Sequence, residues 1–386
     1  MDNTNRIFLH KLLKAIGDSI INIFIPLYIL KVTGQLELSI LYLILNSVCV
    51  VVGMTLLKRV LCSHGLLCII LHALPIIITQ GILAIFSINT VVVVICAVLM
   101  SLAQTLYSIP LNILFASADK SINVSKFQIA TNVGKIFFIL LSGLLLAHIP
   151  ESFVVLCIVA TIFYIASIVP LISTYHTLKV HTRVAREVDR PKVDIWYRLF
   201  HMTFSVFQIT IERVIPLYLY INHLSFEAIS SIIAIIELCK ILANMLANVF
   251  VNRGHYKLSC TLSSAIFLGC LVGILCIKNA VVLYVLSCAI AISFPLCFVP
   301  MFYVFCDKIM HNKSVHRDMI DRDMDIFVIR PIYYGAYFVV GSLTPCIVFG
   351  LACCVMQYIF QLKIVNREHK LIAQDIKSIQ KDHKQA

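Results

Sequence analysis

Charged residues are scarce in this chain. Of its 386 residues only 13% are charged, whereas 60% are hydrophobic; an average soluble domain carries about 25% charged residues. A single water-soluble core stops growing at about 250–300 residues, so this much apolar surface cannot all be buried inside one soluble fold. The composition therefore predicts an integral membrane protein that is solvated by the lipid bilayer.

The sequence also lacks the motifs of several other protein classes. It holds no Gly-x-x-x-x-Gly-Lys-Ser/Thr loop, so we do not expect this chain alone to use ATP. It holds no recognisable set of nucleophile and base, so we expect neither an enzyme nor a bound cofactor. One cluster has metal-binding residue types but matches no standard zinc spacing, so no metal site is predicted. It consists of Cys62, His64, Cys68 and His72.

Cysteine and glycine usage fit the same class. Most of the 15 cysteines lie in apolar runs, where a free thiol behaves as a small hydrophobic group, so no disulfide framework is expected. The 13 glycines are few, and close contacts between helices would then depend on Ala and Ser. The apolar stretch near residue 10 is followed by many more, so we expect no cleaved signal peptide.

Twelve apolar stretches are long enough to cross a bilayer as helices, which takes about 20 residues each. They are 10–31, 37–57, 66–86, 91–114, 127–147, 153–175, 199–221, 228–250, 258–277, 281–305, 326–343 and 346–362. The sequence therefore predicts an all-α polytopic membrane protein with twelve transmembrane helices.

The positive charges indicate an orientation. The net charge is +12, but 25 of the 31 Lys and Arg residues lie in the end segments and alternate loops, all on one side of the predicted helices. This distribution argues against a nucleic-acid-binding face. Because Lys and Arg resist translocation, this distribution predicts a protein of the cell membrane with both termini in the cytoplasm.

The chain repeats itself at an offset of 190 residues. The repeated features are Ile25-Pro26-Leu27-Tyr28 with Ile215-Pro216-Leu217-Tyr218, Glu37 with Glu227, and Pro110 with Pro300. Six spans separate the two copies, so both copies enter the membrane from the same side. This pattern predicts two pseudo-symmetric six-helix halves related by an axis along the membrane normal.

The repeat divides the chain into four parts. We predict an N-terminal half over 1–175, a cytoplasmic linker over 176–198 with six basic residues, and a C-terminal half over 199–362. A basic tail follows over 363–386. Its spaced isoleucines among lysines are typical of a helix lying on anionic lipid, and equally of a disordered, solvated tail.

This architecture resembles the major facilitator superfamily. The loop at 57–65 keeps the basic residues of that family's motif between spans two and three but lacks its aspartate, and 252–257 is a looser copy. Residues 132–135 and 327–330 are similar to short motifs of bacterial members, with Lys135 for Arg and Pro331 for the acid. The resemblance implies a central cavity lined mainly by spans one, four, seven and ten.

Ionisable residues inside the spans are the candidate site residues, because lipid cannot solvate them. Glu237 and Lys240 are three residues apart on one helical face, a spacing that allows an ion pair. They could bind substrate or a proton, or they could form a purely structural pair. Glu212 and Arg213 are adjacent, so they point about 100° apart, and only one of them need face the cavity.

Further polar residues follow the same helical faces. Lys135 would attract an anionic substrate or a carboxylate on another helix. Asp18 can pair with Lys14 and suits a gating or structural charge, as does Arg330, which could instead extend to the membrane interface. The remaining candidates for the cavity are Asn244, Gln104 and Tyr337.

These features predict a secondary active transporter that moves a small molecule by alternating access. The missing ATP site and the buried carboxylates favour a proton or sodium gradient as the driving force. The alternative is a transporter-like receptor or membrane assembly protein that moves nothing. The sequence leaves the identity of the substrate open.

Overall fold

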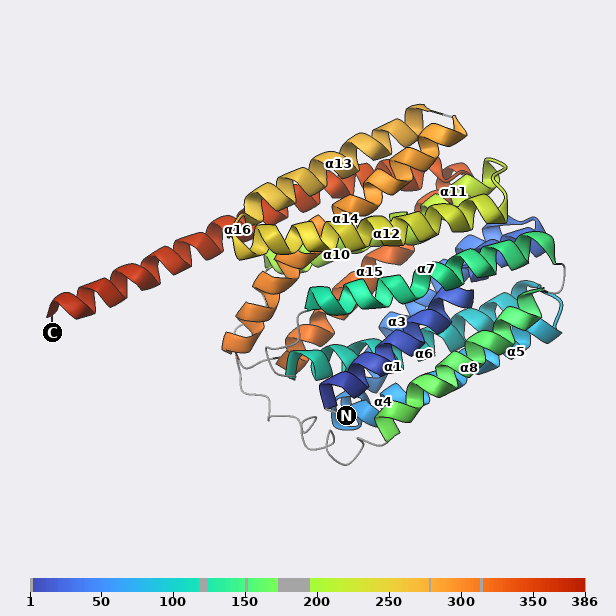
Figure 1. The fold of residues 1–386 in the computed structure, drawn as a ribbon, viewed down its shortest axis with the longest axis horizontal. Coiled ribbons are helices and arrows are strands. Elements are labelled where there is room, and N and C mark those ends of the chain that lie inside the picture. Colours follow the sequence, from blue (N-terminus) through green and yellow to red (C-terminus); the bar gives the residue numbers. More distant parts are fainter. Residues whose placement is uncertain are drawn as a thin grey trace.

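The computed structural model describes residues 3–117, 124–149, 152–172, 195–277, 279–312 and 315–385. Within these ranges the chain forms helices and turns and no β-strand. The predicted linker 176–198 lies outside the described residues except for its last four, of which Ile195 begins a helix. Figure 1 shows one elongated bundle with both termini at the same end.

The helices of the N-terminal half are α1 (Asn3–Gly17), η1 (Asp18–Asn22), α2 (Ile25–Thr33), α3 (Leu36–Ser63), α4 (Gly65–Leu71), α5 (Ala73–Ile85), α6 (Thr90–Ser117), α7 (Val124–His148) and α8 (Ser152–Ile172). Those of the C-terminal half are α10 (Ile195–Ile209), η2 (Thr210–Val214), α11 (Ile215–Ile221), α12 (Phe226–Asn252), α13 (Tyr256–Cys276), α14 (Ala280–Asn312), α15 (Val315–Val340) and α16 (Thr344–Gln385). The two η segments are single turns of π-helix.

Eleven segments among the described residues are long and apolar enough to cross a membrane. The remaining predicted span, 326–343, is the eleventh in chain order and falls mostly in α15, which begins earlier, at Val315, and carries Asp323, Asp325 and Arg330. Its 26 residues extend about 39 Å, enough to cross a bilayer core of about 30 Å. Since both termini lie at one end (Figure 1), an even number of crossings is required, and α15 completes it.

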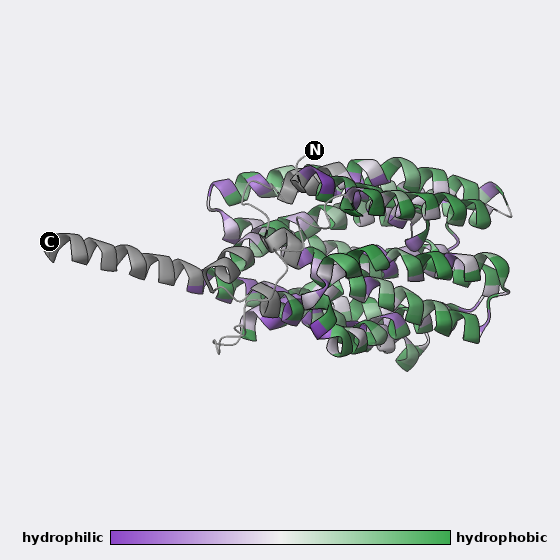
Figure 2. Cartoon of the chain, turned by 90° about the horizontal axis from the view of Figure 1, so that it is seen from below, coloured by the Kyte–Doolittle hydropathy of each residue, from purple (hydrophilic) through white to green (hydrophobic). Residues whose placement is uncertain are grey.

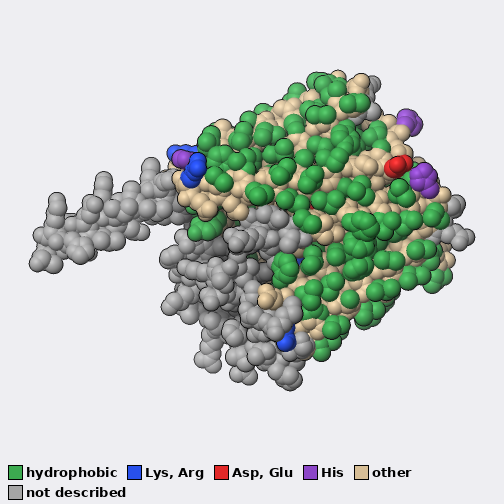
Figure 3. Space-filling view, viewed as in Figure 1, with side chains coloured by type: hydrophobic (Ala, Val, Ile, Leu, Met, Phe, Trp, Pro, Cys, Tyr) green, Lys and Arg blue, Asp and Glu red, His purple; other side chains and the backbone are tan. Residues whose placement is uncertain are grey.

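The outer surface of the bundle is apolar. Large hydrophobic side chains are exposed along it, among them Leu56 (77% exposed) and Val339 (81%). Figure 2 shows hydrophobic residues along most of the helices, with hydrophilic residues toward the ends and loops. In Figure 3 the visible face is mainly hydrophobic between charged or histidine side chains at its two ends. Such a surface is stable against lipid and not against water.

The first helix of each repeat is broken in the same way. A π-helical turn precedes the segment with the Ile-Pro-Leu-Tyr motif, two residues before it in the first repeat and directly before it in the second. Pro26 and Pro216 both occupy the first turn of the next helix. Proline is tolerated there because its missing N–H would have no partner in the helix. Left-handed residues follow both helices, Gly34 (φ 67°) and His223 (φ 65°). The repeat in sequence is thus a repeat in local structure.

Two pairs of helices make the most extensive contacts between the N-terminal and C-terminal parts. α7 packs along α12, and α3 packs along α15. The contact between α7 and α12 is close at Gly143, where an added Cβ would lie only 2.0 Å from the Cβ of Ser230. Glycine is therefore required for this approach of the two helices.

The C-terminal tail continues the last helix. α16 runs without interruption from Thr344 to Gln385, and Figure 1 shows it projecting beyond the bundle. The tail is therefore helical, whereas its contact with anionic lipid stays a prediction.

Candidate substrate-binding cavity

A cavity of about 390 Å³ lies between the two halves. Its walls come from α1 and η1, α3, α6 and α7 on one side, and from α10 and η2, α12 and α15 on the other. The polar and charged residues among its lining are Lys14, Asp18, Ser19, Asn22, Tyr42, Asn46, Ser47, His72, Gln104, Tyr107, Ser108, Lys135, Gln208, Glu212, Arg213, Glu237, Lys240, Arg330 and Tyr334. The volume is in the range of small-molecule sites, about 300–1,000 Å³.

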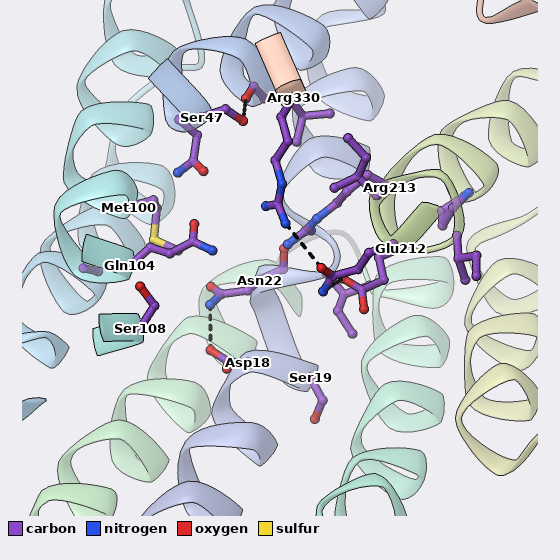
Figure 4. Close-up of a pocket in the computed structure, with 18 of the residues that line it drawn as sticks. Asp18, Ser19, Asn22, Ser47, Met100, Gln104, Ser108, Glu212, Arg213 and Arg330 are labelled. Atoms are coloured by element: carbon purple, nitrogen blue, oxygen red, sulfur yellow. Dashed lines mark hydrogen bonds between the residues drawn. The ribbon is translucent and has the colours of Figure 1, made fainter. Parts of the chain in front are cut away.

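Eight of the ten residues singled out in the sequence line this cavity. They are Glu237, Lys240, Glu212, Arg213, Lys135, Gln104, Asp18 and Arg330. They come from six different elements of the fold, so the polar helical faces that the sequence predicts meet at one cavity. Figure 4 shows several of them projecting into one space.

The Glu237–Lys240 pair expected from the sequence also includes Glu212, whereas Arg213 bonds elsewhere. The Lys240 ammonium nitrogen lies 2.9 Å from a Glu237 carboxylate oxygen and 3.8 Å from one of Glu212. The Lys240 and Glu237 side chains are 9% and 7% exposed, whereas Glu212 is 38% exposed. Glu237 also has one buried carboxylate oxygen without a hydrogen-bond partner among the described residues. Lys240 is therefore the counter-charge of two carboxylates, the buried one of Glu237 and that of Glu212, which is open to the cavity.

A second pair lies on the first helix. The Lys14 ammonium nitrogen is 2.5 Å from Asp18, which confirms the expected pairing. Asp18 also accepts hydrogen bonds from Tyr164 at 2.7 Å and from Asn22 at 2.9 Å; Figure 4 shows the latter contact. The Asp18 charge is thus fully engaged inside the N-terminal half.

Within the described residues, the side chains of Arg213 and Arg330 donate hydrogen bonds to neutral acceptors. Arg213 donates to the backbone carbonyl of Asn22 at 2.8 Å, a bond that joins the two halves. Arg330 donates to Ser205 at 2.9 Å and to Gln208 at 3.3 Å. Arg330 therefore points into the cavity wall and does not extend to the membrane interface.

Lys135 is half-buried on α7 and acts electrostatically on Asp18 and Glu237, which lie on two other helices. No ion pair joins it to either of them within the described residues. Gln104 projects from α6 on the wall opposite the arginines (Figure 4). These two side chains are available to an occupant of the cavity.

Two predicted site residues lie elsewhere. Asn244 is buried, but its side chain bonds back to the carbonyl of Lys240 at 2.8 Å and does not line the cavity. Tyr337 donates to Glu37 at 3.0 Å, at the end of the bundle opposite the termini. Helical spacing identifies a face but not a depth along it, which is why both were grouped with the cavity.

Polar residues without charge were missed. Asn46 and Gln208 line the cavity, as do Tyr42 and Tyr107, and Gln208 also donates to Glu212 at 3.2 Å. A lone Asn or Gln within an apolar span is a usable signal, because its amide needs a partner that lipid does not offer.

The end of the bundle opposite the termini holds matched contacts between the halves. Glu37, at the start of α3, accepts from Tyr337 at the end of α15. Glu227, at the start of α12, lies 3.5 Å from His148 at the end of α7. Because the two glutamates are the copies found at an offset of 190 residues, the repeat places equivalent contacts on both sides of this interface.

The metal-like cluster of the sequence is not assembled within the described residues. No group of three or more His, Cys, Asp or Glu side chains in the described part of the chain is arranged to hold a metal ion. His72 lines the cavity with its ring bonded to the carbonyl of Ile69, whereas His64 is exposed and bonded to Ser63.

Known proteins resemble this chain in fold but not in sequence. No family profile and no curated protein matches the sequence. Among solved structures, a bacterial homologue of the iron transporter ferroportin in the outward-facing state is similar with a TM-score of 0.69 at 13% identity, over 94% of this chain and 99% of that one.

The inward-facing structure of a bacterial ferroportin homologue has a TM-score of 0.67 at 14% identity, over 94% and 98% of the two chains. A bacterial metal transporter has a TM-score of 0.60 at 13% identity, again over 94% and 98%. These likenesses show that the chain shares the all-helical, multi-span fold of these structures.

Proposed function

We propose that this protein is a secondary active transporter that moves a small solute across the cell membrane by alternating access. The observation that carries the proposal is the charged cavity between the halves. Lipid does not solvate such groups, and charges inside spans usually mark a transport pathway. The volume of about 390 Å³ is suited to a small molecule.

The contacts between the halves suit a rocking motion. Glu37–Tyr337 and Glu227–His148 hold the end opposite the termini together with few bonds, of which the latter is exposed and therefore weak. Breaking them costs little compared with unpacking a helix. The solved structures with this fold include both outward-facing and inward-facing states, which supports the same cycle here.

The remaining features of the proposal concern drive and topology. We infer that a proton or sodium gradient supplies the energy, with Glu212 and Glu237 as the acids that would respond to it. We further propose that the two six-helix halves, 1–175 and 199–362, move as units, with the linker and both termini in the cytoplasm. The end with the matched contacts is then the outer end.

Hydrogen–deuterium exchange on the purified protein tests alternating access without a substrate. The variant Gly143→Leu places a side chain where the Cβ alone would lie 2.0 Å from the Cβ of Ser230, so it should force α7 and α12 apart at the outer end. We expect faster exchange over 140–149 and 226–232, and slower exchange at the opposite end of the same helices.

The control is Gly269→Leu, because Gly269 is also within a helix but has nothing within 4 Å of an added Cβ. It should leave exchange unchanged. If Gly143→Leu changes one end with no opposite change at the other, the halves do not alternate. That result would favour a transporter-like receptor or assembly protein.

A further inference from the structure

The cavity carries more positive than negative charge. Five basic and three acidic residues line it. They are Lys14, Lys135, Lys240, Arg213 and Arg330 against Asp18, Glu212 and Glu237. Within a membrane, excess charge of one sign is costly unless it is compensated by a partner or by water.

The three carboxylates are already engaged with lysines. Asp18 is paired with Lys14 at 2.5 Å. Glu237 and Glu212 share Lys240 at 2.9 and 3.8 Å. Each of the three therefore already has a lysine as its counter-charge.

The two arginines are differently placed. Arg213 and Arg330 lie close enough to act on each other electrostatically, and their hydrogen bonds go to a carbonyl, a hydroxyl and an amide oxygen. Glu212 and Asp323 also act on Arg330, but Glu212 is near Lys240, and Asp323 is 3.5 Å from Arg322 and bonded to Asn112. Figure 4 shows both guanidinium groups turned toward the same space.

We propose that the transported substrate is a small anion, held by its carboxylate or phosphate group between Arg213 and Arg330. A guanidinium matches these groups with two parallel N–H donors. Gln104 faces the arginines from the N-terminal half, and Lys135 supplies a further positive charge. An anion would neutralise the excess charge of the cavity, whereas a divalent cation would add to it.

This inference rests on the proposed function and specifies its substrate class. It also separates this chain from its structural neighbours, whose names refer to iron or to metals. The fold is shared, but the lining of the cavity belongs to this sequence, and function follows from the site.

Thermal unfolding of the full-length protein in detergent tests the inference. The probes are succinate, glycerol 3-phosphate and inorganic phosphate at millimolar concentrations, with Mn²⁺ as the cation. A ligand that binds the folded state raises its Tm. We expect a rise with at least one anion and none with Mn²⁺.

The paired variant is Arg213→Gln with Arg330→Gln. Each substitution would remove a charge-assisted hydrogen bond to the anion, so the apparent affinity for the anion should fall by about tenfold or more. The matched control is Arg253→Gln with Lys257→Gln, because both residues are exposed at the junction of α12 and α13. That control removes the same charge outside the cavity and should leave the anion effect unchanged.

Three results would overturn the proposal. They are a Tm rise with Mn²⁺ and not with the anions, no rise with any of the three anions, or an anion effect that survives in the arginine variant. The wild-type comparison of anions with Mn²⁺ decides the question even where the double variant does not fold. Because the exchange experiment on Gly143 uses no ligand, the substrate class can fail while alternating access stands.

Discussion

The substitution Lys240→Gln probes the cluster at the centre of the cavity. Lys240 lies 2.9 Å from Glu237 and 3.8 Å from Glu212. At an effective dielectric constant of about 20, unit charges at these separations attract by about 6 and about 4 kcal/mol. Desolvation opposes these energies, and the 38% exposure of Glu212 reduces its share further.

Removal of the shared cation should therefore cost more than removal of one anion. Lys240→Gln leaves the buried Glu237 without a counter-charge, and breaking a buried pair in this way costs about 3–5 kcal/mol. Glu237→Gln leaves Lys240 with Glu212 and keeps an amide oxygen as acceptor, so about 1 kcal/mol is expected. The double substitution removes the pair together and should lie close to wild type, within about 1 kcal/mol.

Thermal unfolding of the purified variants in detergent measures this order. For a chain of this length about 2 °C per kcal/mol is expected, so Lys240→Gln should lower the Tm by about 6–10 °C and Glu237→Gln by about 2 °C. Equal shifts for the two single variants would refute a shared cation. Transport by the double variant at normal membrane abundance then shows whether the pair has a role beyond stability, since we expect a folded protein without uptake or efflux.

Other predictions follow from the coupling acids, the outer contacts and the topology. Glu237→Gln should remove the pH dependence of transport in proteoliposomes; unchanged pH dependence would assign coupling to Glu212 instead. Tyr337→Phe with Glu227→Gln removes both matched contacts, so faster deuterium exchange is expected at the outer ends of α3 and α12, and no change would mean that packing alone closes this end. An epitope inserted after Arg186 should react with antibody only in permeabilised cells, because the basic linker resists export; reaction in intact cells would invert the topology.

The fold was largely predictable because the bilayer imposes it. A span must satisfy its backbone internally and must be apolar for about 20 residues, so composition and length indicate the helices. The exception is α15, whose charged N-terminal part runs from Val315 while the sequence suggested a span from 326. Asp323 and Asp325 of this helix are buried in protein, with Asp325 held by Arg198 at 2.8 Å, and hydropathy does not record such shielding.

The cavity was predictable in part. Charged residues within spans must contact protein or water, so Glu212 and Arg213 were identified by their position inside a span, and Glu237 and Lys240 also by their helical spacing. Spacing along one helix does not show contacts between helices, so the ion pair of Glu212 with Lys240 on α12 was not predicted. The π-helical turns were missed as well, because no residue in them breaks a helix as proline does.

In the proposed cycle, the π-helical turns would connect the cavity with the movement of the halves. Such turns are frequent at functional sites because they leave backbone groups without their usual partners. Here η1 ends at Asn22, and the carbonyl of Asn22 accepts from Arg213, which belongs to η2. An anion bound by Arg213 competes with that carbonyl, so its arrival would loosen a bond that joins the two halves at the level of the cavity. Binding and the change of access would then act on the same side chain.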